Sequence, residues 1–106
     1  MKPSRSVTYA LAAAVFIAKQ KPPQPILAKT IAQHYNFPLD YLLKVLQQLS
    51  RADILAGIRG PSGGFVLTKP AEKITILEII QAIDGPIVAP AHSSLTPIEF
   101  NEYNNA

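Results

Sequence analysis

The chain of 106 residues contains no cysteine. This absence excludes disulfide bonds, zinc sites with thiolate ligands, a cysteine nucleophile and an iron–sulfur cluster bound through the chain's own sulfur atoms. Charged residues are also few, at 16%, whereas hydrophobic residues reach 48%, a composition that argues against a disordered chain. The length suffices for one domain with a modest core and is too short for two full domains.

Long hydrophobic runs are missing as well. The main apolar stretch, residues 7–18, has twelve residues, and a helix needs roughly 20 to cross a bilayer. Lys2 and Arg5 before this stretch resemble the charged start of a signal peptide, but Lys19, Lys21 and two prolines follow it in place of a small-residue cleavage site. We therefore expect a buried first helix in a cytoplasmic protein, and no membrane partner.

Acidic residues are scarce in the first two thirds of the chain. Residues 1–69 hold nine of the ten lysines and arginines but only Asp40 and Asp53, which gives a net charge of +7. Residues 70–106 hold one lysine and five acidic residues, which gives −4. The overall charge of +3 therefore hides a basic body, suited to a polyanion, and an acidic tail, which we expect to face solvent or a protein partner.

The spacing of apolar residues predicts three helices in the first half of the chain. The first covers residues 6–20 and ends before the prolines of residues 22–25. The second covers residues 27–35 and ends at Asn36, a residue type that tolerates the left-handed conformation of a sharp turn. The third starts near Pro38, since proline suits the first turn of a helix. Two helices joined by a turn of about three residues form a helix-turn-helix.

The third helix is strongly amphipathic, and its two faces have different expected roles. We expect an apolar side toward the core and a polar side toward solvent. The apolar side consists of Leu39, Leu42, Leu43, Leu46 and Leu49. The polar side consists of Asp40, Tyr41, Lys44, Gln47, Gln48 and Arg51.

A β-hairpin and a fourth helix are predicted next. Residues 54–58 and 65–68 are compatible with two strands joined by a Gly/Pro/Ser loop. Thr75 and Glu78 form a capping box that starts the fourth helix, and Gly85 ends it. The apolar face of this helix is expected to be buried, and it consists of Ile76, Leu77, Ile79, Ile80 and Ile83.

The polar side of the third helix carries groups that can read bases in the major groove of DNA. Lys44 can donate to guanine, Gln47 and Gln48 can pair with adenine, and Asp40 can accept from cytosine. Tyr41 and Arg51 lie on the same side and suit phosphates as well as bases. An ordinary amphipathic surface helix has the same pattern, so this helix alone does not separate the two interpretations.

The loop of the hairpin favours DNA binding. A glycine-rich loop with one arginine, Arg59, can lie along the phosphates and insert the guanidinium into the minor groove. The basic N-terminus and the pair Lys19 and Lys21 are further candidates for phosphate contacts. The candidate DNA-binding residues are Lys2, Ser4, Arg5, Pro38, Asp40, Tyr41, Leu43, Lys44, Gln47, Gln48, Arg51, Arg59, Gly60, Ser62, Gly63 and Gly64.

The order helix-turn-helix, hairpin and helix predicts a mainly α fold with a small β-hairpin, a winged helix. Residues 2–86 resemble the Rrf-two family of bacterial winged-helix transcription regulators, which includes iron–sulfur cluster regulators and nitric-oxide-sensing repressors. The residues that carry the resemblance are Tyr9-Ala10-Leu11, Tyr41-Leu42, Arg59-Gly60-Pro61, Gly63-Gly64-Phe65, Ile74-Thr75 and Asp84-Gly85. The resemblance implies a DNA-binding domain over residues 1–86. The resemblance also implies dimerisation through a long C-terminal helix. Residues 87–106 are expected to hold a linker and only the start of this helix, cut short, where Thr96, Pro97 and Glu99 form a helix-start signal.

The chain departs from the family pattern at two kinds of position. Family members that bind a cluster supply three cysteines after the fourth helix, whereas this chain has only His92 there. We expect His92 and His34 to be surface residues, so no metal and no cofactor are expected, and the chain senses another effector or has lost sensing. Some relatives carry a base-reading glutamate where this chain has Leu43, which can offer only apolar contact to a thymine methyl.

These observations predict a sequence-specific transcription regulator, a repressor, that binds double-stranded DNA as a homodimer at a palindromic operator. The alternative is a winged-helix module for protein–protein interaction, because fold alone does not decide function. An enzyme is not expected, since the sequence offers no catalytic triad or metal-spaced cluster.

Overall fold

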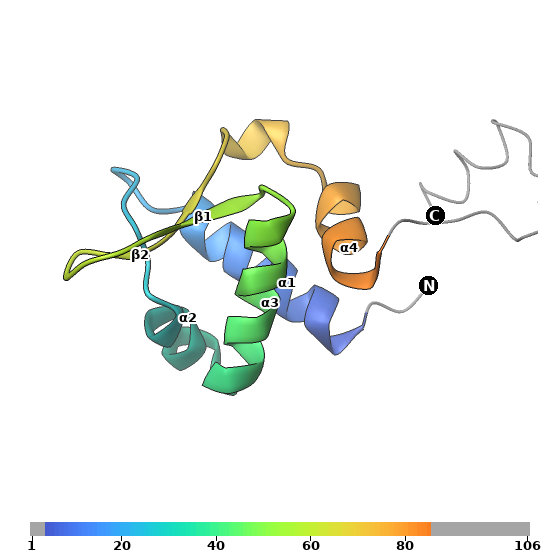
Figure 1. The fold of residues 1–106 in the computed structure, drawn as a ribbon, viewed down its shortest axis with the longest axis horizontal. Helices are drawn as coiled ribbons and strands as arrows, with labels where there is room; N and C mark the ends of the chain where they lie inside the picture. Colours follow the sequence, from blue (N-terminus) through green and yellow to red (C-terminus); the bar gives the residue numbers. More distant parts are fainter. Residues whose placement is uncertain (1–3, 86–106) are drawn as a thin grey trace, which may run out of the picture.

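The computed structural model describes residues 4–85 as a winged helix. The elements are α1 (Arg5–Ala18), α2 (Ala28–Tyr35), α3 (Leu39–Arg51), β1 (Leu55–Ile58), β2 (Gly64–Leu67), the 3-10 turn η1 (Ala71–Lys73) and α4 (Ile76–Asp84). Figure 1 shows α1 and α3 crossing at the centre, α2 beside one end of α3, the hairpin projecting on one side and α4 on the other. The predicted fold class is therefore confirmed. Among residues 4–85, no helix is long and apolar enough to span a membrane.

The helix-turn-helix depends on one left-handed residue. Asn36 ends α2 with φ of 59° and ψ of 46°, and this conformation turns the chain so that α3 begins three residues later. Phe37, in the turn, stacks on the ring of Tyr9 with the ring centroids 3.9 Å apart, which fastens the turn to α1. The predicted turn is confirmed by this conformation of Asn36. Asparagine suits the position because its short polar side chain tolerates the left-handed backbone well.

The buried side of α3 differs in part from the prediction. Leu42, Leu46 and Leu49 are fully buried, but Leu39 is 38% exposed and Val45, with 1% exposure, is buried in its place. At about 100° per residue, the three leucines span about 60° of the helix, with Val45 about 40° beyond one edge of this arc and Leu39 about 20° beyond the other. Periodicity alone therefore favours Leu39, and it is the packing of α3 against its neighbours that buries Val45 instead. The prediction that Leu39 faces the core was therefore wrong, and Leu43 is only half-buried.

The predicted hairpin is confirmed, and the structure adds a third strand position that the sequence did not indicate. β1 and β2 pair antiparallel from Leu55 with Leu67 to Ile58 with Gly64. Ile26, among the prolines between α1 and α2, pairs with Phe65 on the other edge of β2. The amide of Ile26 donates to the carbonyl of Phe65 at 3.0 Å, and the amide of Phe65 donates to the carbonyl of Ile26 at 2.8 Å.

The predicted capping box at the start of α4 is confirmed. The Thr75 hydroxyl accepts from the amide of Glu78 at 3.0 Å, and the Glu78 carboxylate accepts from the amide of Thr75 at 3.2 Å. Lys69, after the hairpin, pairs with the same carboxylate at 2.9 Å. The hydrogen bond from Lys69, and then that from the Thr75 backbone, hold the pKa of Glu78 below its usual value.

The expected burial of the apolar face of α4 was wrong for most of its residues. Only Ile79 is buried, with 5% exposure, whereas Ile76 is 65% exposed. The other three, Leu77, Ile80 and Ile83, are half-buried. A nine-residue helix meets α1 and α3 along one side only, so its remaining apolar residues are covered only in part within residues 4–85.

The bridge between Ile26 and Phe65 generates a prediction for Gly64. This residue has φ of +142°, and a Cβ atom there would lie 2.5 Å from the carbonyl carbon of Ile26. We expect Gly64→Ala to lower the free energy of unfolding by about 1–3 kcal/mol, measured by urea denaturation. Gly57→Ala in β1 is the matched control, because its Cβ would meet nothing within 4 Å. Equal stability of the two variants would contradict this account of the hairpin.

The capping box generates a second prediction. Thr75→Ala removes the oxygen that accepts from the Glu78 amide, and we expect a loss of about 1 kcal/mol in the free energy of unfolding. Thr30→Ala is the control, since Thr30 is an exposed threonine of α2. The control variant should keep its stability or gain slightly, because alanine is the better helix former. A Thr75 variant as stable as the control would show that the cap contributes nothing.

Candidate nucleic-acid interface

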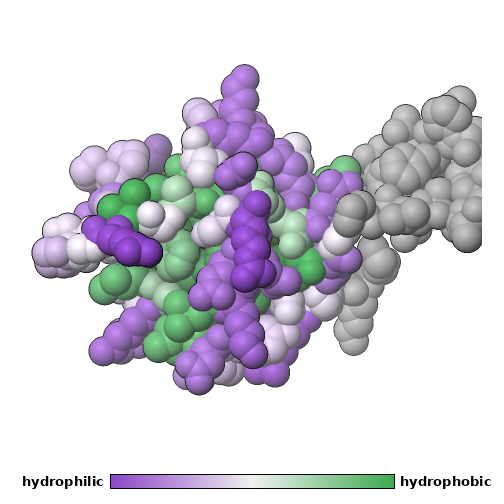
Figure 2. Space-filling view, viewed as in Figure 1, coloured by the Kyte–Doolittle hydropathy of each residue, from purple (hydrophilic) through white to green (hydrophobic). Residues whose placement is uncertain are grey.

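The exposed face of α3 presents one stripe of polar side chains. Asp40, Lys44, Gln47 and Arg51 are all exposed and follow each other at spacings of four, three and four residues, which aligns them along the helix. The opposite side of α3 is fixed in the core by its buried residues, so the helix cannot turn this stripe away from solvent. Figure 2 shows hydrophilic residues gathered over α3, beside apolar surface where the hairpin lies. The stripe combines two cations, an amide and one carboxylate.

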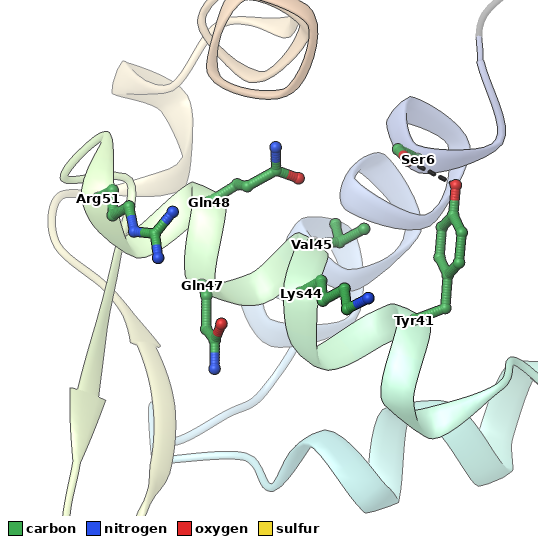
Figure 3. A pocket seen from close by; sticks show the side chains of 7 residues that line it. All are labelled: Ser6, Tyr41, Lys44, Val45, Gln47, Gln48 and Arg51. Carbon is green, nitrogen blue, oxygen red and sulfur yellow. Dashed lines mark hydrogen bonds between the residues drawn. The ribbon is translucent and has the colours of Figure 1, made fainter.

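Tyr41 and Gln48 border the stripe on the side of α1 and are half-buried, not fully exposed as expected. The Tyr41 hydroxyl lies 2.7 Å from the hydroxyl of Ser6 in α1, a hydrogen bond visible in Figure 3. These three residues, together with part of the stripe, line a hollow of about 430 Å³ at the surface. The full lining is Ser6, Tyr41, Lys44, Val45, Gln47, Gln48 and Arg51.

Leu39 and Leu43 border the stripe on its other side. They are four residues apart on the helix, so their side chains lie on the same face. Leu43 also packs against the core, whereas Leu39 is exposed. The stripe therefore has a polar border toward α1 and an apolar border away from it. Pro38, exposed and directly before α3, occupies the N-cap position and offers no amide donor.

The N-terminus of α1 adds a fixed cation beside this surface. Arg5 is exposed, its Nε donates to the Tyr9 hydroxyl at 3.0 Å, and its guanidinium carbon lies 4.7 Å from the centroid of the Tyr41 ring. The hydrogen bond to Tyr9 raises the pKa of Arg5 above its already high usual value. Ser4 is the N-cap of α1, since its hydroxyl accepts from the amide of Val7 at 3.1 Å. Lys2 lies outside the described residues.

The loop between β1 and β2 presents the candidate residues of the wing. Arg59, Gly60 and Ser62 are exposed, and Gly60 has a positive φ of 109°. Gly63 is buried, and a Cβ atom there would lie 2.2 Å from the carbonyl oxygen of Ile58. Gly63 and Gly64 thus have a steric role in shaping the hairpin, whatever they contact outside the chain.

The structure brings together some candidates and separates others. Arg5, Tyr41 and the stripe lie around one surface, and the hairpin projects beside the end of α3 that carries Arg51 (Figures 1 and 3). Lys19 and Lys21 follow the other end of α1, about 20 Å along the helix from Arg5. These two lysines therefore do not belong to the surface around α3.

Sequence reasoning missed Ser6 and the role of Tyr9. The spacing of Arg5 and Tyr9, four residues apart on one helix, is a signal that could have indicated their contact. No local signal links Ser6 to Tyr41, because 35 residues separate them and only the crossing of α1 and α3 brings them together.

No group of three or more His, Asp or Glu side chains in residues 4–85 could hold a metal ion. His34 is exposed, as expected, and its ring lies against Phe16 and Tyr35, with centroids 4.9 and 4.6 Å away. His92 lies outside the described residues.

Comparison with known proteins agrees with this arrangement. The Rrf2 family model, described as "Iron-dependent Transcriptional regulator", matches residues 3–105. The HTH-type transcriptional regulator CymR of Bacillus subtilis is 36% identical over 87 residues, covering 82% of this chain and 63% of its own length. The regulator IscR of Cereibacter sphaeroides is 33% identical over 91 residues, covering 84% of this chain and 59% of its own. The chain thus spans about three fifths of the length of these relatives.

The solved structure of CymR, the global cysteine regulator of B. subtilis, superposes with a TM-score of 0.80 and 29% identity, covering 99% of this chain and 82% of that one. The family description mentions iron, but the donor set of this chain does not fit a thiolate-bound iron centre, because the chain has no cysteine. The family model nevertheless covers almost the whole chain, and the fold is that of the CymR structure. The chain therefore belongs to the Rrf2 family of transcriptional regulators, as a member without cysteine.

Proposed function

We propose that the chain is a sequence-specific DNA-binding regulator that places α3 in the major groove and the wing in the adjacent minor groove. The observation that carries this proposal is the exposed stripe on the second helix of the helix-turn-helix, held outward by the buried side of α3. The stripe extends over eleven residue steps, or about 16 Å of helix. At about 3.4 Å of rise per base pair, this length sets an upper limit of about five base pairs in a half-site, because a helix in the major groove is inclined to the DNA axis.

The side chains of the stripe suit different bases. Lys44 donates to the O6 and N7 atoms of guanine, and Gln47 both donates to and accepts from adenine. Asp40 accepts from the amino group of cytosine, while Arg51, at the end near the hairpin, suits a phosphate or a guanine. The mixture of donors, acceptors and one carboxylate favours selective reading over purely electrostatic attachment, because a carboxylate repels phosphates.

The operator is proposed to be palindromic and to bind two copies of the chain, which then acts as a repressor. A two-fold symmetric pair of helix-turn-helix heads contacts half-sites about one helical turn apart. The assignment of residues 87–106 to dimerisation supports this symmetry and rests on the resemblance to the family. Occupation of an operator by a protein without enzymatic activity favours repression as its simplest effect.

A protein-interaction module remains the second candidate, and exposed apolar surface is the observation in its favour. Val15 of α1 and Ile76 of α4, 46% and 65% exposed, line one apolar hollow together with Leu11, Ile74 and Ile79. The two functions differ in their response to salt. DNA binding weakens steeply as salt rises, with a slope of log K near −0.9 per phosphate contacted, whereas burial of apolar surface does not weaken in this way.

The wing generates the first functional prediction. Arg59→Ala should weaken binding to an operator selected from a random duplex pool by about 1–3 kcal/mol, because the guanidinium leaves the minor groove. The measurement is a gel-shift titration of the full chain at fixed salt. Lys73→Ala is the control of equal charge change, since Lys73 is exposed in η1 and belongs to neither α3 nor the wing. Equal affinities of the two variants would contradict the wing assignment.

Leu43 generates a second functional prediction. At the thymine that Leu43 is proposed to contact in the operator, replacement of thymidine by deoxyuridine removes only the methyl group. We expect about fourfold weaker binding, which is equivalent to about 0.8 kcal/mol for one buried carbon. Leu43→Ala should lose this sensitivity, which is measured as a double-mutant cycle between the side chain and the methyl group. If the variant responds to deoxyuridine as the natural chain does, Leu43 does not read thymine.

A further inference from the structure

We propose that Arg5 forms a preorganised anchor for one backbone phosphate of the DNA, with Tyr9 and Tyr41 as the residues that position it. This inference rests on the proposed function. It adds a positioning mechanism for Arg5, a residue outside α3 and the wing that the sequence indicated only as a candidate for phosphate contacts. The ligand is a phosphate diester in the DNA backbone, not a base. The effect of the anchor is to fix the register of α3 along the groove.

The first argument is that Arg5 stands on a rigid platform. Its guanidinium carbon lies 4.7 Å from the centroid of the Tyr41 ring and 5.4 Å from that of Tyr9, distances at which a cation is attracted to an aromatic ring. Tyr9 is only 9% exposed and stacks on Phe37, and Tyr41 is held by its hydrogen bond to Ser6. The platform therefore belongs to the folded core and does not move with the arginine.

The second argument is that the hydrogen bonding of Arg5 leaves its terminal nitrogens available. A guanidinium has five N–H groups, and the one on Nε is used by the Tyr9 hydroxyl at 3.0 Å. Within residues 4–85, no acceptor is bonded to either terminal nitrogen. These nitrogens carry four donors in a planar arrangement, which matches two oxygens of one phosphate.

The third argument is that the position of Arg5 is unfavourable for the isolated helix. Arg5 is the first residue of α1, and the first turn contains no acidic residue. A cation there meets the positive end of the helix dipole. The carboxylate of Asp84 lies near this end and accepts from Ser4 at 3.5 Å, but it makes no ion pair with Arg5 among the described residues. An anion bound by Arg5 relieves the repulsion from the dipole.

The fourth argument links the anchor to base reading. Tyr41 lies in the first turn of α3 and lines the same surface hollow as Lys44 and Arg51. A phosphate held by Arg5 is thus held at a fixed position relative to the side chains of the stripe. Because contacts to phosphates position a protein and contacts to bases give sequence selectivity, the anchor sets which bases Lys44 and Gln47 meet.

The experiment uses the full chain and an operator duplex recovered by selection. Each phosphate of a half-site is replaced in turn by an uncharged methylphosphonate, and the affinity of the natural chain is compared with that of Arg5→Ala. We expect one phosphate whose neutralisation weakens the natural chain about tenfold and leaves Arg5→Ala unaffected. We also expect the slope of log K against log salt to fall by about 0.9 in Arg5→Ala.

The positioning role of the tyrosine is tested separately with Tyr9→Phe, which keeps the ring and removes the hydroxyl. We expect a two- to fivefold loss of affinity in the natural background and no further loss in the Arg5→Ala background. A purely structural effect of Tyr9 gives the same loss in both backgrounds. Arg5→Lys is the conservative variant, and it should keep the salt slope and lose the dependence on the Tyr9 hydroxyl.

The outcomes separate this inference from the proposed function. If the natural chain selects no duplex and binds none, both fail. If it binds DNA but Arg5→Ala keeps the natural salt slope and the natural methylphosphonate profile, only the anchor is wrong. Because Arg5 is exposed, its variants are expected to fold. Matching urea midpoints of these variants, of Tyr9→Phe and of the natural chain confirm that the comparison concerns binding alone.

Discussion

Burial of one side of α3 is the constraint on which the rest of the structure depends. The helix packs against α1 and α2 through four buried residues of its own, Leu42, Val45, Leu46 and Leu49, and it also contacts β1 and α4. A helix fixed along four positions cannot rotate about its axis. The orientation of the polar stripe is therefore a result of core packing. A substitution in the core that shifts α3 would also shift the side chains of the proposed DNA surface.

The crossing of α1 and α3 gives this surface a second side. Ser6 reaches Tyr41 across the crossing, and Arg5 and Tyr9 complete a cluster in which aromatic rings, hydroxyl groups and a cation contact one another. The cluster connects the start of α1 to the start of α3. The proposed interface is thus assembled from two helices and a hairpin, not from α3 alone.

The sequence predicted the features that depend on neighbouring residues. Asn36 in the turn, Thr75 with Glu78 in the capping box, and the glycine-rich hairpin each follow from local backbone chemistry, and each was confirmed. Features that depend on distant residues were not predicted. The exchange of Val45 for Leu39 in the core, the bond of Ser6 to Tyr41 and the exposure of Ile76 all depend on which elements pack together.

The pairing of Ile26 with Phe65 has a consequence for strand pairing between molecules. β2 would otherwise offer an open edge with unpaired amides and carbonyls, which is a template for strands of other molecules. Ile26 pairs with Phe65 at this edge through both of its backbone groups, and the preceding Pro25 has no amide with which to extend the pairing. A single residue among prolines thus occupies Phe65 without adding a full strand, and it shortens the stretch of this edge on which a strand of another molecule could pair.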